Sequence, residues 1–246
     1  MRRVAAIILI SMVLSSCSSF VDSARQTTQA KLQQFLANQF GQQLEKGIDS
    51  VIEQLTMKGG YLDDPLVRIL LPPPLGLVID IARDLQTNPQ ATLLETLLNQ
   101  AAENTIPVAG PILKNIVTNM TTPSLENLLT AGNSAATDYL KDKSGVLMQA
   151  VLLPAITEEL HANGAIELYG KLLQSKEIID QIPATQVDEN QLSETFQHQA
   201  TIVQIVAPEK LGHYVTEQAM SGLFKKVAEK ELSIRKMGDG IPRFSS

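Results

Sequence analysis

The spacing of apolar residues constrains the fold of this chain more than any other feature of its sequence. Over most of residues 30–235, leucine, isoleucine, valine and phenylalanine recur every three or four positions, with glutamine, lysine and glutamate between them. This period is that of an amphipathic helix that buries one face. The strict alternation of a half-buried strand is missing, apart from a brief candidate at Thr201–Val206. The sequence therefore predicts an all-α fold.

Glycine, proline and polar capping residues divide this pattern into a single domain of roughly eight to ten helices. The first helix is expected from residue 30 to the Gly59-Gly60 pair, with Gly41 and Gly47 as candidate breaks. Asn88-Pro89 supplies an N-cap and a first helical residue, and Pro154 is expected to kink or break a long helix. Further expected helices cover residues 75–85, 89–104, 111–120, 123–129, 134–160, 165–173, 192–206 and 208–235.

The N-terminus has the pattern of a secretory signal peptide. Arg2 and Arg3 place positive charge ahead of an almost wholly apolar run over residues 4–14. At ~1.5 Å per helical residue this run spans about 16 Å, which is roughly half of the ~30 Å core of a bilayer. The run is therefore too short for a membrane-spanning helix and has the length of a signal-peptide apolar region.

A single cysteine follows the apolar run. Leu14, Ser15 and Ser16 lead directly into Cys17, an order that resembles a bacterial lipobox. Small residues before the cysteine let an extended backbone fit a signal peptidase, and the thiol carries the lipid. We predict cleavage before Cys17 and attachment of diacylglycerol, with palmitate among its acyl chains, to the thiol. Two alternatives remain open: a cytoplasmic protein with an incidental cysteine, and a twin-arginine export signal.

Lipidation would hold the mature protein at a membrane without a spanning segment. At ~0.8 kcal/mol per buried CH2, two or three acyl chains are sufficient. Ser18 occupies the position where an aspartate would indicate retention at the inner membrane. The rule used in enteric bacteria therefore favours the inner leaflet of the outer membrane, with the protein facing the periplasm.

These features predict four parts of the chain. They are a lipoprotein signal peptide over residues 1–16, a lipidated tether over 17–29, an all-helical domain over 30–235 and a loose C-terminal tail over 236–246. Because Cys17 is the single cysteine, the stability of the helical domain cannot depend on disulfides.

Charge and aromatic content argue against several classes of partner. The formal charge of −6 becomes −8 once Arg2 and Arg3 are removed (−6 − 2). A net negative surface disfavours nucleic acid and electrostatic adhesion to anionic lipid. With no tryptophan and 4% aromatic residues, stacking platforms for sugars or bases are disfavoured as well.

Four stretches of the sequence resemble a known family. They are GGYLDDPLVRILLPPPL, AAENTIPVAGPILKNIVTNMT, AATDYLKD and YVTEQAMSGLFKKVAEKELSIR, in this order. Their order is similar to that of the bacterial lipoprotein family catalogued as domain of unknown function 4197, from about Gln43 to Arg235. Residues 174–206 look longer and less regular than the resemblance leads one to expect. The resemblance implies an all-helical, envelope-anchored protein and supplies no catalytic residues.

Recognisable catalytic and metal-binding patterns are missing from the sequence. Glu158 and His161 have the spacing of half a di-iron carboxylate site, but such a site needs a second pair and two further glutamates. No cysteine or histidine cluster remains for zinc. The sequence also lacks a Gly-x-Ser-x-Gly elbow, a phosphate-binding glycine loop and a dinucleotide fingerprint. We therefore expect no metal, no cofactor and no enzymatic activity.

Two places are candidate contacts for a ligand or a partner. Arg68 lies within an apolar run, where an arginine must either reach solvent or pair with a carboxylate. A structural ion pair is favoured there over a ligand contact. Thr137, Asp138 and Tyr139 place polar groups beside small residues that allow close helix approach, and close packing is again favoured over a binding role.

Three functions remain compatible with these observations, and the least favoured of them is an enzyme with scattered, unrecognisable site residues. The first is an envelope lipoprotein without catalytic activity that binds or scaffolds an envelope protein. The alternative is a carrier that holds a lipid or another amphiphile in an apolar pocket between helices. An exposed apolar patch on a solid core would favour the first function, and a large enclosed apolar cavity would favour the second.

Overall fold

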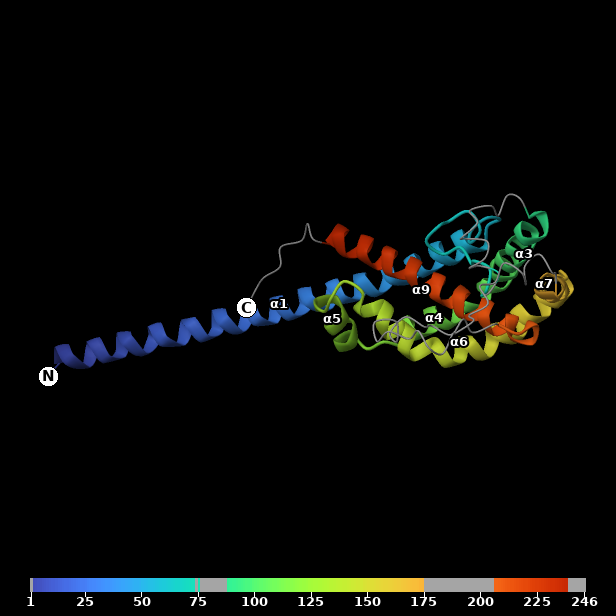
Figure 1. Cartoon of the computed structure of the whole chain (residues 1–246). Helices are drawn as coiled ribbons and strands as arrows, with labels where there is room; N and C mark the ends of the chain where they lie inside the picture. The colour runs from blue at the N-terminus through green and yellow to red at the C-terminus, as the bar shows by residue number, and fades with distance from the viewer. Residues whose placement is uncertain (1, 74, 76–87, 175–205, 239–246) are drawn as a thin grey trace, which may run out of the picture.

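The computed structural model describes residues 2–73, 75, 88–174 and 206–238, and within these ranges the chain is all-helical without a strand (Figure 1). The predicted fold class is therefore confirmed. The elements in chain order are α1 (Arg2–Thr56), α3 (Pro89–Thr105), η2 (Ile106–Val108), α4 (Ala109–Thr118), α5 (Thr122–Thr130), α6 (Ala135–Ala162), α7 (Ala165–Gln174), η3 (Pro208–Lys210) and α9 (Leu211–Gly238).

The described residues contain fewer α-helices than the roughly eight to ten expected. Most of the expected helices over 75–85 and 192–206 lie outside the described residues.

Helix α1 is continuous over 55 residues, so the expected start near residue 30 is wrong. The predicted cleavage point before Cys17 therefore falls within this helix. Gly41 and Gly47 do not break it, because each fits a close contact with another helix. A Cβ atom at Gly41 would lie 3.1 Å from a methyl group of Leu125, and one at Gly47 would lie 2.9 Å from Lys230 Cγ. Tertiary packing thus outweighs the low helix propensity of glycine.

The N-terminal part of α1 extends away from the other helices (Figure 1). Among the side chains that the structure describes, which begin at residue 27, the first buried one on α1 is Ala37. From there, Phe40, Leu44, Ile48 and Val51 face the core at spacings of three and four. Among the described side chains of α1, packing against the helical body therefore begins at Ala37.

Helix α6 runs without interruption through Pro154. Proline removes one helical hydrogen bond and usually bends or ends a helix. Here Pro154 is exposed, while Leu152 and Ile156 on either side are completely buried and hold both halves in one helix. The expected break at Pro154 is therefore wrong. The most extensive contact between helices joins α6 to α9.

Asn88 caps α3 as the sequence predicts. Its side-chain oxygen accepts hydrogen bonds from the backbone N–H groups of Gln90 and Ala91, both at 3.1 Å. Pro89 occupies the first helical position, where its missing N–H has no cost. The local rules for helix starts therefore hold at this position.

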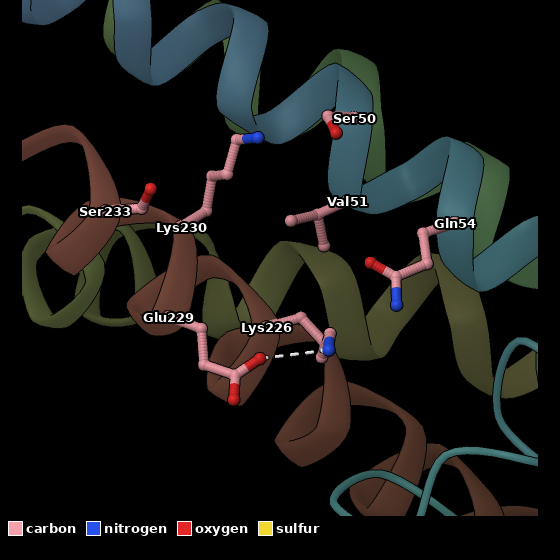
Figure 2. A pocket seen from close by; sticks show the side chains of 7 residues that line it. All are labelled: Ser50, Val51, Gln54, Lys226, Glu229, Lys230 and Ser233. Atoms are coloured by element: carbon pink, nitrogen blue, oxygen red, sulfur yellow. Dashed lines mark ion pairs between the residues drawn. The ribbon is translucent and has the colours of Figure 1, made fainter. Parts of the chain in front are cut away.

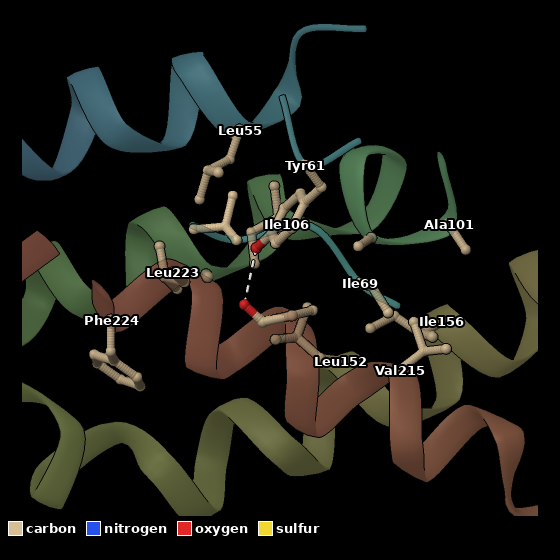
Figure 3. Packing of buried hydrophobic residues seen from close by; sticks show 14 of the residues in the cluster. Leu55, Tyr61, Ile69, Ala101, Ile106, Leu152, Ile156, Val215, Leu223 and Phe224 are labelled. Atoms are coloured by element: carbon tan, nitrogen blue, oxygen red, sulfur yellow. Dashed lines mark hydrogen bonds between the residues drawn. The ribbon is translucent and has the colours of Figure 1, made fainter. Parts of the chain in front are cut away.

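A single hydrophobic core contains residues of α1, α3, η2, α4, α6, α7 and α9 (Figure 3). Leu55 of α1, Leu152 of α6 and Leu223 of α9 converge on it. Tyr61, from the segment after α1, lies at its centre with no exposed surface. The Tyr61 hydroxyl donates a hydrogen bond of 2.9 Å to the carbonyl of Ala219 in α9. Burial raises the pKa of this hydroxyl far above its usual value, and the nearby Glu103 raises it further.

No helix in the described ranges combines the length and the apolar character that are needed to cross a membrane.

We expect opposite effects of alanine at two helical glycines. A Cβ atom at Gly222 of α9 would lie 3.0 Å from Tyr61 Cε1 and 3.1 Å from Val67 Cβ. The Tyr61 ring cannot move aside, because it is buried and its hydroxyl is bonded to Ala219. A Cβ atom at Gly145 of α6 would meet no atom within 4 Å.

Chemical denaturation measures the difference directly. Gly222→Ala should lower the free energy of unfolding by about 1–2 kcal/mol, because overpacking outweighs the gain in helix propensity. Gly145→Ala is the matched control and should raise the free energy of unfolding by about 0.5–1 kcal/mol. Stabilisation by both variants would show that α9 does not pack tightly on the Tyr61 ring.

Candidate functional site

The predicted lipidation site lies within α1. The backbone of Leu14, Ser15, Ser16 and Cys17 is helical there. Their side chains are outside the described part of the structure, so lipid attachment at Cys17 stays a prediction.

Arg68 pairs with a buried carboxylate. Its Nε donates a hydrogen bond to Oε1 of Glu95 on α3. The Glu95 side chain is only 2% exposed, whereas 41% of the Arg68 side chain is exposed. Arg68 therefore reaches the surface and also neutralises a buried charge, which is the ion pair favoured from the sequence. Burial raises the pKa of the neighbouring Tyr214 to about 12, and the charge of Glu95 adds to the shift.

Glu95 belongs to a row of buried polar residues on α3 that holds residues 59–71, which we call the 59–71 segment. Asn99 lies one turn further, and its amide accepts from the Ile69 N–H and donates to the Ile69 carbonyl, both at 2.8 Å. Glu103 follows after another turn and accepts from the backbone N–H groups of Tyr61 and Leu62 at 3.1 and 3.2 Å. Side chains of α3 thus replace the backbone partners that a strand would supply.

Helix α9 holds the 59–71 segment from another side. The Tyr214 hydroxyl donates to the Leu70 carbonyl at 3.0 Å. The Lys226 ammonium group lies 3.0 Å from the carboxylate of Asp64, and this hydrogen bond holds the pKa of Asp64 below its usual value. The segment corresponds to most of the GGYLDDPLVRILLPPPL motif, so the residues that this motif contributes have a structural role here.

Thr137 takes part in a second buried polar contact, which is centred on Glu231 of α9. The Glu231 carboxylate accepts from the N–H of Ala136 at 3.0 Å and from the N–H and hydroxyl of Thr137 at 2.8 and 2.7 Å. Glu231 therefore caps the N-terminus of α6, where negative charge is favoured. Sequence analysis missed Glu231, although a glutamate on the apolar face of the last helix is a signal that it has a buried partner.

Arg235 completes this contact. Its Nε donates to Glu231 Oε1 at 2.9 Å, and its terminal nitrogens donate to the carbonyls of Leu128 and Leu129 at the end of α5. The guanidinium carbon also lies 4.9 Å from the centre of the Phe40 ring on α1. The Glu231–Arg235 pair thus links α1, α5, α6 and α9.

Asp138 and Tyr139 lie nearer the surface than Thr137. Asp138 is exposed and accepts a hydrogen bond from the Ser134 hydroxyl at 2.9 Å. Tyr139 is half-buried, and the Lys143 amine lies 5.7 Å from the centre of its ring. Thr137 is thus buried against Glu231, whereas Asp138 and Tyr139 lie nearer the surface. Arg68 is not part of this group, because it pairs with Glu95 on α3.

No group of three or more metal-ligating side chains occurs within the described ranges. His161 has an acidic neighbour other than Glu158, because its Nδ1 lies 3.7 Å from Glu167 Oε1. Both side chains of that pair are more than half exposed.

An open groove of about 150 Å³ lies between α1 and α9 (Figure 2). In it, the Lys226 ammonium group is 2.9 Å from the Glu229 carboxylate. The lining residues are Ser50, Val51, Gln54, Lys226, Glu229, Lys230 and Ser233. This groove has the mixed charge of an ordinary helix surface, and it is not the enclosed apolar pocket that a carrier requires.

Helix α6 carries a contiguous exposed apolar surface. Val146 is 85% exposed, Leu147 is 54% exposed and Val151 is 38% exposed. Ala150 and Pro154 are exposed beside them. We call these five residues the α6 face. Large exposed apolar side chains that gather within two turns of one helix are typical of an interaction surface.

The fold and its buried contacts define an all-helical protein whose buried carboxylates join helices and backbone. The chain belongs to the family described as "Protein of unknown function (DUF4197)", whose model matches residues 32–240. The match is wider than the resemblance seen in the sequence and runs through residues 174–206. No curated protein and no solved structure matches the chain.

Loss of the Glu231 carboxylate should destabilise the whole fold. Glu231→Ala leaves Arg235 without its buried partner and removes the acceptor for the first N–H groups of α6. We expect the free energy of unfolding to fall by about 3–5 kcal/mol in urea titrations. Glu229→Ala, two residues earlier and 55% exposed, is the control and should cost less than about 1 kcal/mol. Equal losses in the two variants would contradict the role given to Glu231.

Proposed function

We propose that this protein is a non-catalytic lipoprotein of the bacterial envelope that binds a protein partner through the α6 face. The observation that carries the proposal is the exposure of Val146, Leu147 and Val151 on a helix that is packed into the core along another line of residues. Exposed apolar surface is unfavourable in water at about 25 cal/mol per Å², so a partner that covers this face gains that free energy.

The predicted anchor at Cys17 supports a place for this surface at a membrane. About 20 helical residues separate Cys17 from Ala37, the first buried residue described on α1, and they span about 30 Å. This part of α1 lets the helical body lie up to about 30 Å from the lipid anchor. Because Ser18 rather than an aspartate follows Cys17, the membrane is the outer membrane and the helical body faces the periplasm.

The buried polar groups support a role without catalysis. Every buried side-chain nitrogen and oxygen in the described ranges has a hydrogen-bond partner. Glu95, Glu103 and Glu231 are all engaged with an arginine or with backbone N–H groups, so their charges serve packing. The carrier alternative gains no support from the groove between α1 and α9, which is open and lined by lysines.

In-cell photo-crosslinking tests the binding function. A photo-reactive amino acid at Leu147 should give a discrete crosslinked product in the full-length protein, because this side chain would lie within the interface. The same amino acid at Gln149, which is also exposed but lies on another side of α6, is the control and should give little product. Absence of a crosslinked product at all three positions, Leu147, Val146 and Val151, would contradict the proposed function.

Lipidation and its consequences can be tested separately. The wild-type protein should incorporate labelled palmitate and fractionate with the outer membrane, whereas Cys17→Ser should do neither. Ser18→Asp should keep the palmitate label but shift the protein to the inner membrane. Equal labelling of wild type and Cys17→Ser would contradict lipid attachment at Cys17. The proposed location in the envelope would then fall, whereas binding through the α6 face would not be affected.

A further inference from the structure

We infer that the partner of the α6 face is the same face of a second copy of this chain, packed with the two α6 helices antiparallel. This inference rests on the proposed function and names its partner. The reason for choosing a second copy is that the charges at the two ends of this face are self-complementary.

The residues that a facing helix would meet lie along one line of α6. At about 100° per residue, Lys143, Leu147, Ala150, Val151, Pro154 and Glu158 fall within an arc of about 100°, and Val146 of the α6 face lies about 40° beyond its edge. The four central residues are apolar, with a basic residue at one end and an acidic residue at the other. Each of the six is at least a third exposed among the described residues.

An antiparallel pair brings opposite charges together. When the two-fold axis passes between positions 150 and 151, position i of one copy faces position 301 − i of the other. Leu147 then faces Pro154, and Ala150 faces Val151. Lys143 faces Glu158 at both ends, so two identical ion pairs flank the apolar centre.

A parallel pair is disfavoured by the same charges, because it would place Lys143 against Lys143 and Glu158 against Glu158. The other acidic residues nearby do not interfere with the antiparallel pair. Asp142 and Glu159 lie more than about 100° around the helix from the centre of the line. The Lys143 ammonium group lies 3.1 Å from Asp142 in a pair that is more than half exposed. Such a pair is worth at most about 1 kcal/mol, so Lys143 can exchange Asp142 for the partner's Glu158 with little loss.

The size of the face predicts a weak dimer. The contact uses one helix from each copy. The area that it buries is therefore smaller than the roughly 800 Å² per partner of a standard stable interface. Ala150 at the centre allows the helix axes to approach within the usual 8–10 Å. Two lipid-anchored copies share one membrane surface, and this confinement raises their effective concentration toward the millimolar range in which weak contacts form.

The arrangement also places the two anchors. Helices α1 and α6 run in the same general direction in the chain (Figure 1), so an antiparallel α6 pair directs the two α1 N-termini to opposite ends of the dimer. Both lipids reach one membrane when the N-terminal part of α1 lies along its surface. Leu32 and Phe35 are exposed apolar residues on that part of α1, with 37% and 59% of their surfaces accessible. They are suited to contact the lipid interface in this orientation.

Charge reversal tests the pairing in the full-length protein purified in detergent. Lys143→Glu or Glu158→Lys alone should raise the dimer dissociation constant about tenfold, because each places like charges at both ends of the interface. The double variant Lys143→Glu with Glu158→Lys should return to within about twofold of wild type. Lys141→Glu lies on another side of α6 and is the control, with no expected change. Melting curves of all four variants check that each one folds.

Cysteine crosslinking in membranes tests the geometry independently. Two differently tagged full-length chains, one with Lys143→Cys and the other with Glu158→Cys, should crosslink with a short bis-maleimide only when they are expressed together. Crosslinking of Lys143→Cys with itself would overturn the antiparallel pair.

The outcomes separate this inference from the function on which it rests. A monomer at all accessible concentrations, together with a photo-crosslink from Leu147 to a different protein or to residues 175–205 of the same chain, overturns the dimer. A crosslink to a different protein preserves the binding function, whereas a crosslink to residues 175–205 of the same chain removes it. No crosslink of any kind overturns both.

Discussion

The burial of helix ends is the constraint on which the rest of this structure depends. A helix leaves its first N–H groups and its last carbonyls without internal partners, and burial makes such groups costly. Helix α9 covers the end of α5 and the start of α6, so both sets of groups need partners from α9. Glu231 accepts from the N–H groups of α6, and Arg235 donates to the carbonyls of α5. Because the two side chains also pair with each other, neither buried charge is left uncompensated.

The 59–71 segment meets the same requirement in another way. It has turns but neither helical nor strand hydrogen bonds over most of its length, and Tyr61 and Ile69 are completely buried. Asn99 supplies both a donor and an acceptor to Ile69, and Glu103 supplies an acceptor to the turn at Tyr61. The sequence motifs that mark the family in this segment and in α9 thus include the residues that hold the fold together. In the structure these residues join helices and backbone to one another.

Sequence reasoning succeeded where local chemistry decides and failed where tertiary packing decides. The cap at Asn88 depends on two neighbouring N–H groups, and it was predicted correctly. Gly41 and Pro154 were expected to interrupt helices, but contacts from distant residues keep both helices intact. The need of Arg68 for a carboxylate could be inferred from its apolar neighbours, whereas its partner Glu95, 27 positions away, could not. Glu231 was missed because its importance depends on α5 and α6, which the sequence does not place beside it.

The α6 face was hidden from the sequence for a geometric reason. The buried residues of α6 recur every four positions, at Leu140, Ser144, Met148, Leu152, Ile156 and Leu160. Four residues turn the helix by about 400°, so the buried line winds around the helix and apolar residues occur on all of its sides. From its sequence pattern, such a helix is predicted to be buried on all sides. The described body covers only one winding line, and Val146 on the other line remains 85% exposed. Core packing therefore accounts for the apolar residues of one line of α6, whereas Val146, Leu147 and Val151 remain exposed on the other.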